Sequence, residues 1–217
     1  MSNLIEQLSE SLMRSEGISS DKRPLAQRNL QDSYLYFLSL CNGGYAKDGF
    51  FHFFGTVGPT RHELVAWNQP DSWKAHFGLD DQWFVFAEDI FGTQFFFDVR
   101  GTRRAVKMLI PDNGSVSLCA NSFEDFVEDE IFGEDAGGRA RHLARQFFQE
   151  KGLMFRPFAH IACKIPILLG GKQVLENLEF EDSLTNLSIL GQVYGQVKDL
   201  PPGTPIENIH IDRRRMP

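Results

Sequence analysis

The stretch Phe84–Asp98, FVFAEDIFGTQFFFD, places six phenylalanines around one acidic break that contains a glycine. Side chains alternate between the two faces of a strand, and here apolar residues occupy both faces on either side of the break. The stretch therefore predicts two strands, Trp83–Glu88 and Thr93–Val99, in a sheet that is covered on both sides. Between them, Asp89 begins a short hairpin loop in which Gly92 supplies a positive φ.

The flanking sequence extends this hairpin into a larger sheet with helices around it. Further strands are predicted at Phe50–Gly55, Ala105–Ile110 and Ser115–Ala120, the last two joined by an Asn-Gly turn. Apolar residues at helical spacing predict helices over residues 3–14, from Pro24 to Cys41, from Ser122 onward and over Arg139–Lys151. We expect an α+β fold, with an antiparallel or mixed central sheet of about five to six strands and helices packed around it.

The pattern changes after Gly152. We expect a strand over Ile161–Leu169, bent at Pro166, and a last strand that carries Ile206, Ile209 and Ile211. These elements suggest two parts: a main α+β domain over residues 1–151, and a C-terminal extension over residues 152–217 that packs on it.

Composition narrows the classes of function. The formal net charge of the 217 residues is −7, which argues against non-specific nucleic-acid binding and is compatible with a basic protein partner. No apolar run approaches the roughly 18 residues of a membrane helix, and the segment MSNLIEQLSESLMRSEG lacks the features of a signal peptide. Three dispersed cysteines suggest neither a disulfide framework nor a zinc site, so we expect a cytoplasmic protein.

The sequence contains no recognisable catalytic motif. Its six histidines show no metal-ligand spacing, and there is no GxSxG elbow or phosphate-binding loop. Glu88 and Asp89 with Asp98 would suit a magnesium site or a carboxylate-dependent hydrolase. The alternative is that these acidic residues form ordinary turns and caps. We favour the second interpretation and expect no catalytic residue, no metal and no cofactor.

Two surface features suggest a partner protein. The segment Ser122–Gly138 contains seven carboxylates and neither lysine nor arginine, so its helix presents an acidic face. Such a face is either simply solvated or a docking surface for a basic partner, for example a nuclease. The tryptophans Trp67, Trp73 and Trp83 either belong to the core or line a recognition surface.

Four segments, YLYFLSLCNGGY, FFHFFG, WFVFAEDIFGTQFFFD and SFEDFVEDEI, together resemble the SUKH superfamily of Smi/Knr-like proteins, over roughly residues 25–133. The matching features are the pair Gly43-Gly44 after a helix, Glu88-Asp89 with Gly92 in a hairpin loop, and Phe123 with Phe126 at a helix start. That superfamily includes yeast cell-wall-assembly regulators and many bacterial immunity proteins. The later segments KIPILLGG and LGQVYGQVKDLPPGT also resemble immunity proteins paired with type VI secretion effectors. Both classes remain open at this point.

The resemblance implies an α+β fold without catalysis that binds and neutralises a cognate toxin, often a nuclease, in the cytoplasm of the producing cell. The partner would then be a basic toxin protein, not nucleic acid or membrane. A regulatory or scaffold module is the alternative, and a carboxylate-dependent hydrolase is less favoured. The candidate toxin-binding residues are Glu88, Asp89, Glu124, Glu128, Asp129, Glu130, Trp67 and Trp73.

Overall fold

The computed structural model describes residues 2–13, 25, 30–56, 61–100, 105–201 and 203–213. Its centre is a six-stranded antiparallel sheet in which each strand pairs with its neighbour in sequence, in the order β1-β2-β3-β4-β5-β6. A second sheet contains only β7 and β8. The strands are β1 (Gly44–Ala46), β2 (Phe51–Phe53), β3 (Trp83–Asp89), β4 (Gln94–Asp98), β5 (Val106–Ile110), β6 (Ser115–Ala120), β7 (Ala159–Cys163) and β8 (Leu178–Asp182).

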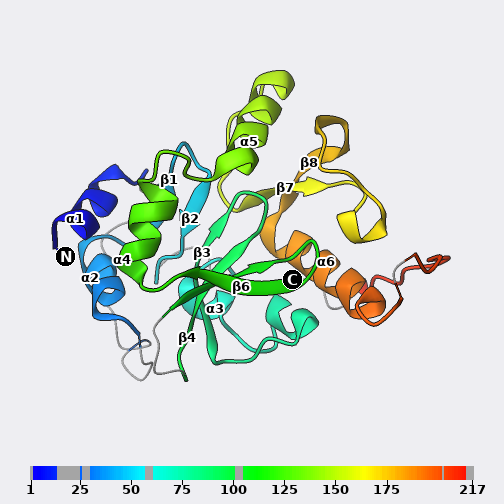
Figure 1. The fold of residues 1–217 in the computed structure, drawn as a ribbon, viewed down its shortest axis with the longest axis horizontal. Helices are drawn as coiled ribbons and strands as arrows, with labels where there is room; N and C mark the ends of the chain where they lie inside the picture. The colour runs from blue at the N-terminus through cyan, green and yellow to red at the C-terminus, as the bar shows by residue number, and fades with distance from the viewer. Residues whose placement is uncertain are drawn as a thin grey trace.

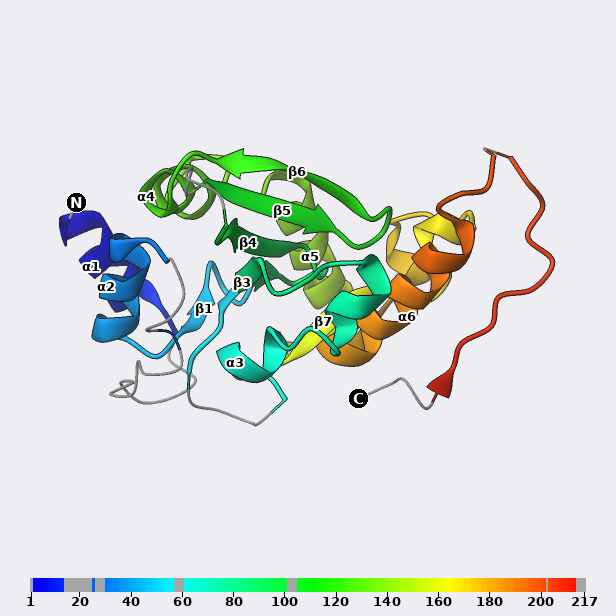
Figure 2. The ribbon, with the colours of Figure 1, turned by 90° about the horizontal axis from the view of Figure 1, so that it is seen from below.

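Helices lie at both ends of the central sheet (Figures 1 and 2). Helices α1, α2 and α4 lie at one end, and α6 lies at the other beside β7. The α-helices are α1 (Ser2–Ser11), α2 (Asp32–Leu40), α3 (Leu64–Trp67), α4 (Phe123–Phe126), α5 (Gly138–Lys151) and α6 (Ser183–Val197). Short 3-10 turns are η2 (Trp73–Phe77), η4 (Ile167–Leu169) and η5 (Leu175–Asn177), and η3 (Val127–Ile131) is a π-helix. The predicted α+β class is confirmed.

One face of the sheet forms an aromatic core with α2 and α4. The rings of Phe86 and Phe97 stack across the predicted hairpin with their centroids 4.4 Å apart. Tyr34 of α2 packs 5.5 Å from the Phe86 ring and 5.3 Å from the ring of Phe123. Aromatic rings bury large areas and prefer such offset and edge contacts, which explains why so many phenylalanines occur in the hairpin.

The opposite face of the sheet is covered over the central strands, where Val85 and Phe96 are buried, as the two-sided hydrophobic pattern predicts. Strand β2 pairs with β3 only from Ala87 to Asp89. Beyond that point, the Asn68 amide accepts a hydrogen bond from the Val85 amide at 2.8 Å and donates to the Val85 carbonyl at 2.7 Å. The Asn68 side chain thereby satisfies the backbone of β3 where β2 no longer reaches it, as burial requires.

The C-terminal residues pack on the sheet. The amide of Ile161 in β7 donates to the carbonyl of Ile90 in the β3–β4 loop at 2.7 Å. Helix α6 lies against η2, and a Cβ at Gly191 would come within 2.4 Å of the Cβ of His76. Glycine at this position therefore allows the close approach of these two elements.

Several predicted elements differ from the structure. Helix α2 begins at Asp32, because Gln31 is extended and its side chain accepts a hydrogen bond from the Phe123 amide; Pro24 lies outside the described residues. The strand predicted over Ile161–Leu169 ends at Cys163, and η4 follows. Strand β1 was not predicted, because the glycine pair indicated only a helix end.

The predicted last strand through Ile206, Ile209 and Ile211 is wrong. Within the part of the chain that the structure describes, this segment has no strand neighbour, and glutamine side chains of α6 bind its backbone instead. Gln196 accepts from the His210 amide at 3.0 Å and donates to the His210 carbonyl at 2.9 Å. Gln192 likewise accepts from the Asp212 amide at 2.7 Å.

Candidate functional site

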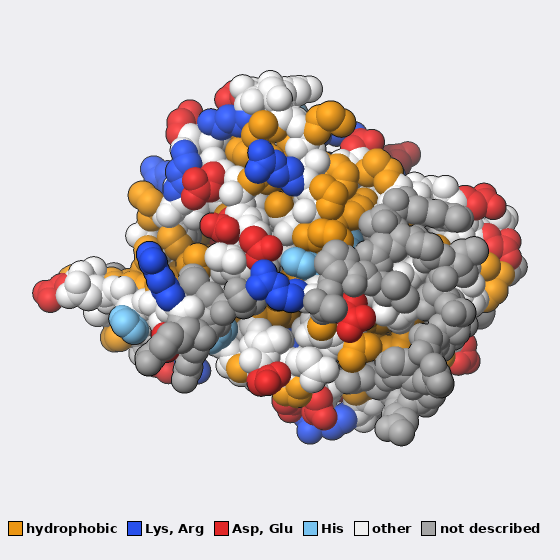
Figure 3. Space-filling model, turned by 180° about the vertical axis from the view of Figure 1, so that it is seen from behind, with side chains coloured by type: hydrophobic (Ala, Val, Ile, Leu, Met, Phe, Trp, Pro, Cys, Tyr) orange, Lys and Arg blue, Asp and Glu red, His pale blue; other side chains and the backbone are white. Residues whose placement is uncertain are grey.

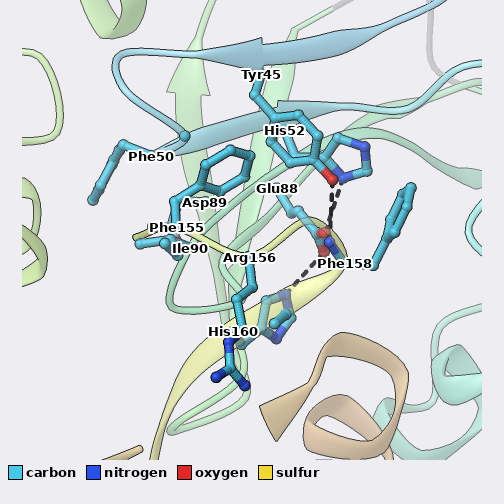
Figure 4. Close-up of a pocket in the computed structure, with 12 residues that line it drawn as sticks. Tyr45, Phe50, His52, Glu88, Asp89, Ile90, Phe155, Arg156, Phe158 and His160 are labelled. Carbon is cyan, nitrogen blue, oxygen red and sulfur yellow. Dashed lines mark hydrogen bonds and ion pairs between the residues drawn. The ribbon is translucent and has the colours of Figure 1, made fainter. Parts of the chain in front are cut away.

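Glu88, the first candidate site residue, lies in β3 with its carboxylate buried at the centre of a polar cluster (Figure 4). His52 Nδ1 donates to Glu88 Oε1 at 3.1 Å, and His160 Nε2 donates to Oε2 at 3.1 Å. Gln94 Nε2 also donates to Oε2, at 2.9 Å. Both carboxylate oxygens are thus occupied by protein donors.

The cluster continues in both directions from Glu88. Trp67 Nε1 donates to Gln94 Oε1 at 2.9 Å on one side. On the other side, Asn186 Nδ2 of α6 lies 3.0 Å from His160 Nδ1. The cluster therefore links α3, the central sheet, β7 and α6, and buried polar groups that are fully paired in this way specify a unique arrangement.

Local features of the chain fix the two histidines. The Tyr45 ring stacks on His52 with the centroids 4.5 Å apart. Gly92 has a φ of +92°, and a Cβ there would lie 2.9 Å from His160 Cε1 and Nδ1. The glycine that the sequence assigns to the hairpin turn therefore also makes room for the His160 ring.

The electrostatics of the cluster favour an ionised Glu88. Burial alone would raise the pKa of Glu88, but electrostatic attraction and hydrogen bonds from His160 and His52 hold it well below its usual range. A general base has to reach the proton that it abstracts. Glu88 is buried and its oxygens already accept three hydrogen bonds, so this arrangement suits a structural link better than catalysis.

Asp89 organises the hairpin loop. Its Oδ1 accepts hydrogen bonds from the amides of Phe91 and Thr93, each at 2.9 Å. This geometry is typical of an aspartate that stabilises a turn. Burial raises the pKa of Asp89 to about 6, against the lowering effect of the hydrogen bonds from Thr93 and Phe91.

Asp98 does not join these two residues. It pairs with Trp83 at the opposite end of the β3–β4 hairpin, whereas Glu88 pairs with Gln94. Its carboxylate lies 3.5 Å from Lys107 Nζ. The trio that a magnesium site or a hydrolase would need is therefore not assembled, and no group of three or more metal-binding side chains occurs among the described residues.

The two tryptophan candidates lie in the interior of the protein. Trp67 and Trp73 are buried, and their rings pack against each other with the centroids 5.9 Å apart. They support the polar cluster and η2 from inside the protein. The sequence offers both interpretations for these residues, and their burial agrees with the core interpretation.

The acidic candidates lie on α4 and η3. Ser122 caps α4 as predicted, because its hydroxyl accepts a hydrogen bond from the Asp125 amide at 3.0 Å. Glu124 is half-buried and accepts a hydrogen bond from Ser33 Oγ at 2.8 Å. The following π-helix buries Val127 and Ile131.

Between these two buried residues, the π-helix carries three consecutive acidic residues, Glu128, Asp129 and Glu130. Glu128 and Asp129 are exposed, and neither forms an ion pair within the described part of the chain. Glu130 is half-buried; burial, and then the nearby Asp129, raise the pKa of its carboxyl. Short π-helices recur at functional sites in other proteins.

The predicted site residues omit four members of the buried cluster: His52, His160, Gln94 and Asn186. His160 lies 72 residues from Glu88 in the chain, and no motif links the two positions. A buried glutamate generally requires buried hydrogen-bond donors. The sequence therefore indicates that such donors exist, but it does not identify them.

Part of the chain matches a known protein family. Residues 26–129 match the model of the SMI1/KNR4 family (SUKH-1). These residues form a SUKH-1 domain. The match agrees with the resemblance noted over roughly residues 25–133 and spans α2 to the acidic π-helix. SUKH proteins are commonly immunity proteins of polymorphic toxin systems and are generally non-catalytic.

The chain is also similar in fold to a solved structure. The crystal structure of Atu4351 from Agrobacterium tumefaciens superposes with a TM-score of 0.57 over 86% of this chain and 87% of that one, at 15% sequence identity. The likeness therefore extends beyond the SUKH-1 domain into the C-terminal residues. A comparison with curated proteins found no match. Among the described residues, no helix has the length and apolarity needed to cross a membrane.

Proposed function

We propose that this protein is an immunity protein that binds a cognate toxin and neutralises it in the cytoplasm of the producing cell. The SUKH-1 domain carries the proposal, because immunity is the common role of that family. The buried cluster agrees with a binding role, since Glu88 is used to hold the protein together and is closed to a substrate.

The exposed acids of η3 suggest what kind of toxin is bound. Glu128 and Asp129 are exposed carboxylates, and no lysine or arginine occurs from Ser122 to Gly138. On the face seen from behind Figure 1, basic, acidic and hydrophobic side chains are interspersed (Figure 3). A segment that carries only negative charges attracts a basic partner and speeds its association. A nuclease has such a basic surface where it binds the phosphates of its substrate. The partner we propose is therefore a basic toxin, with a nuclease as the leading class.

Co-expression tests this function directly. The toxin encoded beside this gene is expressed in a heterologous bacterial host, with and without this protein, and survival is counted. We expect the wild-type protein to restore growth. Failure of the wild-type protein to protect against that toxin, or to bind its inactivated form, would contradict the proposal.

Charge reversal tests the acidic contact separately. The variant E128K/D129K should weaken protection, because both side chains are exposed and their loss would cost little stability. The matched control E150K/E207K makes the same change in net charge at exposed positions elsewhere. Equal protection by the two variants would show that η3 is not a contact, while leaving the immunity function intact.

A further inference from the structure

Strand β6 is an open edge of the central sheet. It is last in the strand order, so among the described residues only β5 pairs with it. Its first four residues, Ser115 to Leu118, are all exposed, with Val116 at 42% and Leu118 at 60%. In Figure 2, β6 runs along the upper margin of the molecule, with no element drawn beyond it.

The other edge of the sheet is closed. Strand β1 is buried along its length, and Tyr45 forms an antiparallel bridge with Met13. Proteins usually guard an exposed edge with charged residues, proline or bulges. Strand β6 contains neither a charged residue nor proline, and its one register shift lies at Val106/Lys107, near its C-terminal end. Ser115 to Leu118 therefore offer regular backbone to an added strand.

Apolar side chains lie beside this open backbone. Leu118 pairs with Lys107, and Val116 pairs with Leu109, so Leu118 and Val116 share one face of the sheet. The Lys107 ammonium lies 4.7 Å from the centroid of the Trp83 ring on the same face. Every second side chain of an added strand would pack on these groups, which is the contact that stabilises neighbouring strands.

The charges near β6 favour a basic partner for this edge. Glu130 Oε1 lies 3.9 Å from Cys119 Sγ, which places the acidic π-helix next to the C-terminal end of the strand. A basic residue at the matching end of an added strand would lie near the π-helix that carries Glu128, Asp129 and Glu130. A second copy of this chain is disfavoured, because each copy carries a net charge of −7.

We propose that the β6 edge binds an extended basic segment of the cognate toxin as an additional strand of the sheet. This inference rests on the proposed immunity function and names the surface that performs it. Backbone hydrogen bonds would provide affinity that does not depend on the sequence of the added strand. Selectivity would come from contacts with the exposed side chains of Val116 and Leu118 and with the acidic residues of η3.

The test combines a variant with a backbone measurement. Catalytically inactivated toxin, made from the neighbouring gene, is titrated by calorimetry into the wild-type protein and V116K/L118K. Lysine guards strand edges and repels a basic partner, so the dissociation constant should rise by about tenfold or more. The control V174K changes an exposed valine in the C-terminal part and should leave binding within about twofold. Hydrogen exchange on the wild-type protein should show slower exchange of β6 amides when the toxin is bound.

The possible results distinguish a failure of the β6 docking site from a failure of the proposed immunity function. If the toxin binds the wild-type protein and V116K/L118K equally and β6 amides exchange as before, the edge is not the docking site and the immunity function stands. If the wild-type protein binds no toxin, both fail. If the free protein is a dimer that V116K/L118K dissociates, the occupant is a second copy, and the inference is overturned. The exchange measurement decides the question even if the variant fails to fold.

Discussion

Glu88 and His160 form a buried hydrogen bond of 3.1 Å, although 72 residues separate them in the chain. Glu88 belongs to the SUKH-1 domain, and His160 belongs to the β7 strand that follows it. The bond therefore joins the family domain to the C-terminal residues through the interior of the protein. Stability should depend on this pair more than on any exposed ion pair.

Replacing Glu88 with alanine should lower the free energy of unfolding by about 3–5 kcal/mol, because it leaves His52, His160 and Gln94 buried without their acceptor. Urea denaturation at pH 7 measures the change. The control E179A removes an exposed carboxylate from β8 and should change stability by about 0.5 kcal/mol or less. Similar losses in both variants would show that the cluster contributes little.

Replacing Gly92 with alanine should destabilise the protein in two ways: a left-handed backbone at φ +92°, and a Cβ placed 2.9 Å from the His160 ring. Gly170 is a matched control, since its φ is +87° and a Cβ there would meet nothing within 4 Å. We expect both variants to bear the backbone cost of about 1 kcal/mol or more, and G92A to lose additional stability. Equal unfolding midpoints would mean that the His160 ring adjusts without cost.

Asp89 should give the stability a measurable pH dependence. The native pKa of about 6 lies above the unfolded value of about 3.9, so between these values the native state binds more protons. Stability from this group therefore falls as the pH rises from about 4 to about 6, by about 3 kcal/mol at 1.36 kcal/mol per pKa unit. Glu88 has the opposite effect, because its pKa is lowered in the native state. Its contribution to stability is present above the unfolded pKa of about 4.3 and is lost as the pH falls below that value.

The variant D89N isolates this effect, because its amide oxygen can still accept from Phe91 and Thr93 but does not titrate. The stability difference between D89N and wild type should increase in favour of D89N from pH 4 to pH 6.5. Urea denaturation across this range gives the difference directly. A constant difference would show that Asp89 titrates near its usual value in the native state.

The C-terminal segment should depend on the two glutamines of α6. In Q192A/Q196A the amides of His210 and Asp212 lose their side-chain acceptors, so both should exchange with solvent faster. Global stability should change little, because the segment is mostly exposed. The control Q149A removes an exposed glutamine from α5. Unchanged exchange at both amides would mean that other contacts hold the segment.

Local patterns in the sequence predicted the sheet well. The alternation in Phe84–Asp98 and the Asn-Gly turn placed β3 to β6 within about one residue, because both depend on short-range chemistry. The same reasoning failed for the segment with Ile206, Ile209 and Ile211, where the backbone of His210 pairs with the Gln196 side chain and not with a strand. The start of α2 was also missed, since a tertiary hydrogen bond from Phe123 to Gln31 holds that residue extended.

The candidate site was harder to predict, because its members come from distant parts of the chain. Glu88 and Asp89 were recognised as a polar break, but their environment depends on His160 and Asn186, which only the fold brings near. The two tryptophans illustrate the same limit, since composition does not distinguish a buried indole from an exposed one. The acids of η3 were predicted as an exposed face, and Glu128 and Asp129 are exposed; their role in toxin binding stays a prediction.

The position of His160 has a consequence for exchanging parts between related proteins. A chimera that keeps the SUKH-1 domain but takes its tail from another protein would inherit Glu88 without the imidazole that hydrogen-bonds to it. Such a recombinant would tolerate the graft only if the donor tail supplied an equivalent side chain at the same place. The two regions therefore have to change together for the buried pair to be kept.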